Sequence, residues 1–220
     1  MGRDCEETPG KGKVDMFSRR ALLGAMALAA LVAPMTGAWA AEPPACTKGE
    51  LTEEGLHRQP WFVQDTFFDM KEELAQAREK GKFFAVIIEQ KGCPYCKMMH
   101  EKYFGEMPEI CDLMRKNFRV LQVNLKGSQE VTDFDGTPLP ENEWAKRYME
   151  KYWTPYILFF RPDADTLKVK EPKERLIEAM VGLPNPFNFK AYLLYVTERA
   201  YEKQDFRSYL RDLWARQAKK

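Results

Sequence analysis

The stretch FFAVIIEQKGCPYCK, residues 83–97, combines a strand, a cysteine pair and the start of a helix in one run. Its first six residues are continuously apolar and end in branched side chains, which is typical of a central strand covered on both faces. Cys93 and Cys96 follow a short polar link, with a proline and a tyrosine between them. Pro94 stands in the first turn of a helix predicted over residues 93–104, where its missing N–H costs nothing.

Two cysteines separated by two residues at a strand-to-helix junction can close a small disulfide ring and open it again. We expect Cys93 to be the attacking thiol, because a helix N-terminus favours negative charge and lowers the pKa of a thiol below its free value of about 8.5. Lys91 and Lys97 flank it and act in the same direction. Cys96 would be the resolving thiol, which attacks the mixed disulfide and releases the reduced partner. A purely structural disulfide is the alternative, although so short a ring is usually a redox couple.

Apolar patterns place further elements on either side of this unit. Helices are predicted over residues 65–80, 108–116, 141–152, 187–203 and 206–219, and strands over residues 118–125, 156–160 and 174–181. Between them, residues 126–140 form an insertion rich in turn signals, in which residues 131–134 would be one arm of a small hairpin. The aromatic side chains of the last two helices repeat at helical spacing, which indicates core packing.

A second motif, WTPY over residues 153–156, opens one of these strands. We predict a cis bond between Thr154 and Pro155, because X–Pro bonds are where cis peptides occur in folded chains. Such a proline would face the cysteine pair. An ordinary turn proline is the alternative.

Together these features resemble the thioredoxin superfamily. The resemblance rests on CPYC after a strand, on Thr154 and Pro155 about 60 residues later, and on VGL at residues 181–183, and it covers roughly residues 61–201. It implies an α/β thioredoxin fold, a central mixed β-sheet flanked by helices. This chain would add an insertion before the helix that leads to the cis-proline, and an extra C-terminal helix.

Within that superfamily, the chain is most similar to the periplasmic thioredoxins of the SoxW type. The residues that carry this similarity are EQ at 89–90, GCPYCKMMH at 92–100 and VTDFDG at 131–136. The resemblance implies that Pro94 and Tyr95 tune the couple and contact the substrate. It also implies that Pro155 lies against the cysteines and that Thr154 offers backbone hydrogen bonds to the substrate strand.

One departure from the family's pattern concerns the proton acceptor. Thioredoxins carry a buried acid six residues before the first cysteine, and here that position holds Ile87. Glu89, at the end of the strand, is the nearest candidate, and a solvated or salt-bridged glutamate is the alternative. His100 shares a helix face with Cys96. Three roles are possible for it: a packed or hydrogen-bonded histidine, a proton-transfer group, or a metal ligand. A metal site with both cysteines would lack a clear fourth ligand.

Two further cysteines, Cys46 and Cys111, lie outside the motif. Cys111 stands in a helical apolar context and is most simply a buried thiol, whereas Cys46 lies in the lead-in at residues 41–60. A disulfide between them is the alternative, since sequence alone does not fix connectivity.

The N-terminus indicates export. Residues 16–40 contain a basic start, a short apolar stretch and an Ala-x-Ala site, which are the parts of a bacterial secretory signal. We expect cleavage after Ala40, which leaves an extended lead-in at 41–60 and a thioredoxin-like domain at 61–220. An uncleaved anchor is the alternative. The run SRRALL, residues 18–23, also resembles the twin-arginine motif, so both export routes stay open.

Charge and length bound the class of protein. Of 34 basic and 33 acidic residues, five and four lie in residues 1–40, so the mature part carries 29 of each. A nucleic-acid-binding domain would show a basic excess, so we expect no nucleic acid as partner. About 180 mature residues bury a sufficient core without disulfides, which favours a functional role for the cysteines.

We therefore expect a periplasmic thiol–disulfide oxidoreductase that reduces protein disulfides, without cofactor or metal and as a monomer. The resemblance implies a partner in sulfur oxidation and a membrane electron-transfer protein as reductant. A disulfide-forming oxidase, a cytochrome c maturation thioredoxin and a non-catalytic binding module of the same fold are the alternatives.

Overall fold

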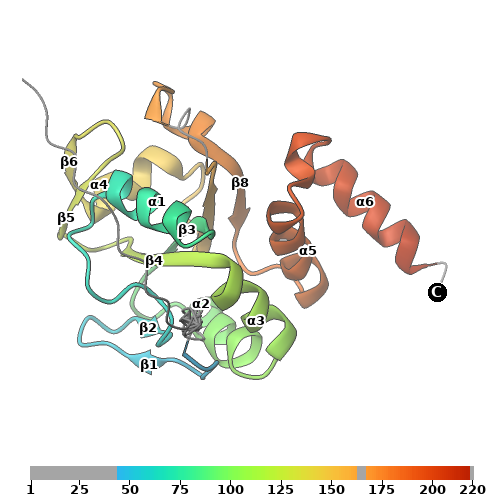
Figure 1. The fold of residues 1–220 in the computed structure, drawn as a ribbon. Helices are drawn as coiled ribbons and strands as arrows, with labels where there is room; N and C mark the ends of the chain where they lie inside the picture. The colour runs from blue at the N-terminus through green and yellow to red at the C-terminus, as the bar shows by residue number, and fades with distance from the viewer. Residues whose placement is uncertain (1–43, 163–166, 219–220) are drawn as a thin grey trace, which may run out of the picture. The chain divides into compact units, whose positions relative to one another are not determined.

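The computed structural model describes residues 44–162 and 167–218 (Figure 1). The expected signal segment, residues 1–40, lies outside the described residues, so its cleavage stays a prediction. Among the helices of the described part, none is both long and apolar enough to cross a membrane.

Four strands form the central sheet in the order β4–β3–β7–β8. Their bounds are Phe83–Glu89 for β3, Phe118–Asn124 for β4, Tyr156–Phe160 for β7 and Leu176–Val181 for β8. β3 pairs in parallel with β4 and antiparallel with β7, and β7 pairs antiparallel with β8. The predicted central strand and mixed sheet are confirmed.

Helices cover both faces of this sheet (Figure 1). The helices are α1 (Met70–Glu79), α2 (Pro94–Met98) with a π-helical continuation (Met99–Phe104), α3 (Pro108–Asn117), α4 (Glu141–Tyr148), α5 (Pro186–Thr197) and α6 (Phe206–Gln217). Side chains along β3 alternate between two hydrophobic clusters: Ala85 and Ile87 pack with α3 and α5, and Phe84 and Val86 with α1 and α4. This explains the unbroken apolar run of the strand.

The insertion between β4 and α4 forms the predicted hairpin, with β5 (Glu130–Thr132) antiparallel to β6 (Pro138–Pro140). Its loop passes through Gly136 at φ 83°, a left-handed conformation that favours glycine. The expected extra helix at the C-terminus is α6. The fold class predicted from the sequence is confirmed.

Some predicted boundaries are wrong. The first helix begins at Met70 instead of residue 65, because Phe68 adopts a positive φ and the Asp69 side chain caps the backbone N–H groups of Lys71 and Glu72. The helix predicted over 141–152 ends at Tyr148, because the next residue, Met149, adopts an extended conformation with ψ 137°.

Two elements near the C-terminus are also shorter than predicted. β8 begins at Leu176, after a 3-10 turn (Pro172–Arg175). α5 ends at Thr197, because Arg199 adopts a left-handed conformation before a second 3-10 turn (Ala200–Glu202).

The expected lead-in contains a hairpin that the sequence did not predict. β1 (Glu50–Leu51) pairs antiparallel with β2 (His57–Arg58), and Gly55 supports the turn at φ 80°. Leu56 is buried, so the segment is part of the folded body and not a loose extended arm.

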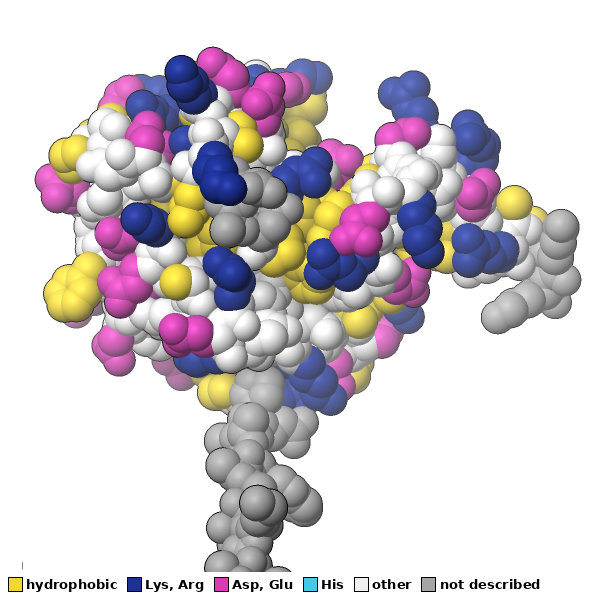
Figure 2. Space-filling view, turned by 45° about the horizontal axis from the view of Figure 1, so that its top comes forward, with side chains coloured by type: hydrophobic (Ala, Val, Ile, Leu, Met, Phe, Trp, Pro, Cys, Tyr) yellow, Lys and Arg dark blue, Asp and Glu magenta, His cyan; other side chains and the backbone are white. Residues whose placement is uncertain are grey.

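Basic and acidic side chains are interspersed over the face that Figure 2 shows. This distribution agrees with the equal numbers of basic and acidic residues in residues 41–220.

The first residue of α4 carries a buried carboxylate that makes stability depend on pH. Glu141 is 4% exposed and accepts a 2.8 Å hydrogen bond from the backbone N–H of Asn124. Burial raises the pKa of Glu141 from 4.5 to about 7. The folded state therefore binds a proton at Glu141 more tightly than the unfolded chain does. The stability that this proton contributes is complete below pH 4.5 and is lost as the pH rises through about 7.

We expect Glu141→Gln to be more stable than the wild type at pH 8 by about 1–3 kcal/mol, because the charged form is no longer buried. At pH 5 the two proteins should differ much less. Urea unfolding at both pH values measures this, and Glu143→Gln, an exposed position on the same turn, is the control. An advantage of equal size at both pH values would contradict the assignment.

Candidate active site

The cysteine pair forms a disulfide at the start of α2. Cys93 is the residue that caps this helix, so the helix begins one position later than predicted. Its sulfur accepts a hydrogen bond of 3.1 Å from the backbone N–H of Cys96. Both cysteines are buried, and Cys96 is the less exposed of the two, at 3% against 8%. The arrangement leaves Cys93 as the more accessible sulfur.

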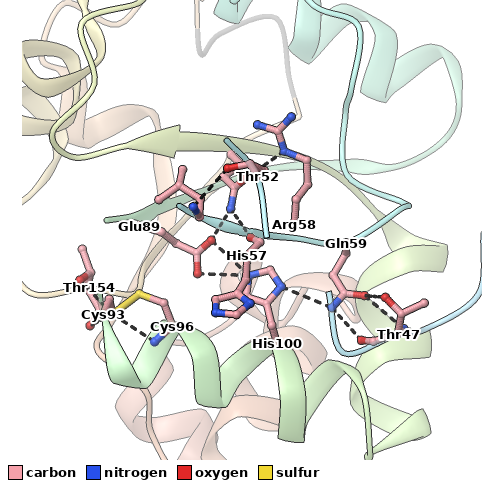
Figure 3. Close-up of polar contacts among 12 residues, drawn as sticks. Thr47, Thr52, His57, Arg58, Gln59, Glu89, Cys93, Cys96, His100 and Thr154 are labelled. Atoms are coloured by element: carbon pink, nitrogen blue, oxygen red, sulfur yellow. Dashed lines mark hydrogen bonds and ion pairs between the residues drawn. A yellow bond between two sulfur atoms is a disulfide. The ribbon is translucent and has the colours of Figure 1, made fainter. Parts of the chain in front are cut away.

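The second motif lies against the first, as predicted. The peptide bond between Thr154 and Pro155 is cis. The Thr154 carbonyl oxygen lies 3.4 Å from the Cys93 sulfur, and the Thr154 hydroxyl donates to the same sulfur over 3.2 Å (Figure 3). The hydroxyl contact was not anticipated, since the sequence indicated only a backbone role for this residue.

Two donors therefore converge on the Cys93 sulfur, the N–H of Cys96 and the hydroxyl of Thr154. Hydrogen bonds to a charged acceptor are roughly twice as strong as neutral ones. When the disulfide opens, both donors and the helix N-terminus stabilise a thiolate on Cys93.

Exposed apolar side chains lie next in sequence to the cysteine pair, to the cis-proline and to Gly182. Tyr95 follows Cys93 by two positions, Trp153 directly precedes Thr154, and both are more than half exposed. Val181 is also exposed, and the next residue, Gly182, donates its N–H to the Pro155 carbonyl over 2.9 Å. Thr154 contacts Cys93, and Gly182 bonds to Pro155, so contacts link the three segments that carry these exposed apolar groups.

Glu89 is buried at the end of β3, with 1% of its surface exposed, so the solvated alternative is wrong. Its carboxylate accepts hydrogen bonds from the side-chain amide of Gln122 and from Nε2 of His100, which lies 3.1 and 3.2 Å from the two oxygens. Glu89 is thus held by partners from β4 and from the helix that carries the cysteines.

His100 is completely buried, and both ring nitrogens have side-chain partners. Nδ1 lies 3.3 Å from the amide nitrogen of Gln59, and Nε2 faces Glu89. The hydrogen-bonded histidine, one of the three alternatives, is confirmed. The described residues hold no cluster of three or more His, Cys, Asp or Glu side chains suited to a metal ion.

A cavity of about 450 Å³ separates the β1–β2 hairpin from the start of α2. Glu89 and Cys96 both line it, and His57 lines it from the hairpin. Burial, and next the nearby His100, lower the pKa of His57, so this imidazole is neutral at pH 7. Glu89 and Cys96 therefore line the same cavity.

Residues 70–197 match the family of thioredoxin-like domains. The chain belongs to this thioredoxin-like family. It is similar to a thioredoxin-fold protein from Helicobacter pylori, with 17% identity, a TM-score of 0.46, and 60% of this chain and 83% of that chain covered. It is also similar to a thioredoxin from Thermus thermophilus, with 22% identity, a TM-score of 0.44, and 59% and 85% covered. No curated protein matches the chain.

This thioredoxin-like protein contains a second disulfide, between Cys46 and Cys111. Of the alternatives that the sequence left open, the disulfide is the one that the structure shows. Cys111 is fully buried in α3, and the bond ties the segment before β1 to that helix. The N-terminal hairpin is thereby anchored beside the redox cysteines.

Sequence reasoning missed two polar residues of the site, Gln59 and Gln122, and the hydroxyl contact of Thr154. One of them left a signal. Gln122 is a polar residue within the buried strand β4, opposite Ile87 in the parallel register. A polar side chain at a buried strand position needs a buried partner, which here is Glu89.

Proposed function

We propose that this protein is an exported thiol–disulfide oxidoreductase that reduces protein disulfides in the periplasm. The observation that carries the oxidoreductase assignment, in either direction, is the Cys93 sulfur, where two donors and a helix N-terminus stabilise a thiolate. The reducing direction rests on the resemblance to SoxW-type thioredoxins. The buried Cys96 on the next turn completes a couple that opens and closes.

The reaction begins with the dithiol form. The Cys93 thiolate attacks one sulfur of a substrate disulfide, which forms a mixed disulfide and releases the other substrate sulfur as a thiolate that takes up a proton. Cys96 then gives its proton to Glu89 and attacks the Cys93 sulfur. This step restores the Cys93–Cys96 disulfide and releases the second substrate sulfur as a thiolate, which takes up a proton, so two electrons pass to the substrate.

The surface around the disulfide suits a protein substrate. Pro94 and Tyr95 between the cysteines, and Thr154 and Pro155 opposite them, form the substrate-binding part of the site in this proposal. Exposed aromatic groups such as Trp153 supply the apolar contact that a protein segment needs.

The remaining parts of the proposal rest on the sequence. The signal-like segment in residues 16–40 supports export, by either route. A membrane electron-transfer protein restores the dithiol, and the likeness to SoxW-type thioredoxins suggests a partner in sulfur oxidation. The protein acts as a monomer and does not bind nucleic acid.

A disulfide-forming oxidase is the second candidate, and one contact favours it. The Thr154 hydroxyl stabilises a thiolate on Cys93, hence the reduced form, and a stabilised reduced form makes a couple more oxidising. The direction of the reaction therefore depends on the reduction potential of the Cys93–Cys96 couple.

We expect the Cys93–Cys96 couple to have a reduction potential near or below about −220 mV, in the range of reductants. Equilibration of the mature protein with glutathione or dithiothreitol measures it, and the Cys96→Ser variant, which lacks the couple, is the control. A value near about −120 mV would place the protein with oxidases, and the reductase proposal would be abandoned.

A further inference from the structure

A chain of polar contacts runs from Thr47 through Gln59 and His100 to the Glu89 carboxylate (Figure 3). Thr47 follows Cys46 directly. Its carbonyl accepts from the Gln59 amide nitrogen over 2.8 Å, and its N–H and hydroxyl both lie 3.3 Å from the Gln59 amide oxygen. These three contacts orient the amide, with its nitrogen toward Nδ1 of His100 at 3.3 Å.

This orientation determines which nitrogen of His100 carries the proton. Because the Gln59 amide nitrogen is a donor, Nδ1 of His100 must be the acceptor. The ring proton of the neutral imidazole is then on Nε2, which faces both oxygens of Glu89. His100 therefore acts as a hydrogen-bond donor to the carboxylate.

We propose that His100 is a positioning residue, which Gln59 and the N-terminal hairpin hold in the tautomer that orients Glu89 to accept the proton of Cys96. The inference rests on the proposed function and extends it, because it makes the segment before β3 part of the redox site. Glu89 departs from the family position for the buried acid. Of its two side-chain partners, His100 lies on the helix that carries the cysteines, whereas Gln122 lies on β4.

The proposed role of Glu89 also depends on the other titratable and charged groups near it. His57 lies across the cavity and is neutral at pH 7, while Lys91 and Lys97 line the cavity with Glu89. Arg58 donates to the Gln122 side-chain oxygen over 3.0 Å, and so acts on Glu89 through that amide. His100 and Gln122 are thus its direct partners among the contacts of the described residues.

The experiment separates the two chemical steps. Reduced protein is mixed with 5,5′-dithiobis(2-nitrobenzoate), an aromatic disulfide that releases one coloured thiolate when Cys93 attacks and a second when Cys96 resolves the mixed disulfide. His100→Leu removes the contact to Glu89, whereas His100→Gln keeps an N–H donor. We expect His100→Leu to slow the second release about 10- to 100-fold and shift its pH profile, with the first release unchanged.

His100→Gln should restore most of the second rate. Equal rates in His100→Leu and the wild type would overturn the inference, as would equal slowing of both releases in both variants. A wild type with no second release would instead refute the proposed function, and the inference with it.

A second variant keeps the test valid if His100→Leu does not fold. Gln59→Met removes the donor to Nδ1 and leaves His100 in place. Gln64→Met is the matched control, since Gln64 lies on the same segment and its amide donates to the carbonyls of Gln59 and Phe62. A slower second release in Gln59→Met alone supports the inference, and equal behaviour of the two variants overturns it.

Discussion

Replacing Cys93 with serine is expected to abolish disulfide reduction, with a loss of about 1000-fold or more in rate. A serine hydroxyl is not ionised at neutral pH, so the donors from Cys96 and Thr154 would have no thiolate to stabilise. Insulin reduction, followed by turbidity with dithiothreitol as electron source, measures the effect. Unchanged activity in Cys93→Ser would mean that the protein is a binding module.

The matched variant, Cys96→Ser, should behave differently. It keeps the attacking sulfur and loses the resolving one, so mixed disulfides with partner proteins should accumulate. These species can be isolated from cells that express the variant and identified by mass spectrometry. A trapped sulfur-carrier protein would support the role in sulfur oxidation, and its reproducible absence would count against that role.

Replacing Asp133 with alanine is expected to destabilise the fold by about 3–5 kcal/mol. Asp133 is 1% exposed and accepts hydrogen bonds from Trp144 at 3.0 Å, Tyr148 at 2.7 Å and Arg147 at 2.6 Å. Its carboxylate also lies 3.5 Å from the buried Arg175. Alanine would leave that guanidinium buried without its counter-charge, and breaking one side of a buried pair is strongly destabilising.

Urea unfolding measures this effect, and Asp135→Asn is the control. Asp135 also faces Arg147, at 3.4 Å, but it is exposed, so its loss should change the free energy of unfolding by less than about 1 kcal/mol. If the two variants unfolded at the same urea concentration, the buried network would not be the main support of the insertion hairpin.

The sequence predicted the features that local chemistry dictates. An unbroken apolar run becomes a strand buried on both faces, as β3 is. The cysteine before Pro94 becomes the helix cap. Each of these outcomes depends on neighbours within a few residues, which is why a pattern suffices.

Element ends and the N-terminal hairpin were harder to predict for a physical reason. Phe68 takes a positive φ, a conformation that no local preference of phenylalanine favours, and this ends the extended segment before α1. The β1–β2 pair has two residues in each strand, too few for an alternating pattern. The Cys46–Cys111 disulfide spans 65 residues, and connectivity at that distance is decided by packing.

The sequence by itself determined that this chain is a thioredoxin-like protein with a cysteine pair opposite a cis-proline. Two short motifs, CPYC at 93–96 and WTPY at 153–156, contain the residues that predict these features. Only the tertiary structure decided what surrounds Glu89. Its partners His100 and Gln122 are 11 and 33 residues away, and Gln59 is 41 residues from His100. A buried carboxylate must find donors to replace water, and which donors it finds depends on how separate elements pack.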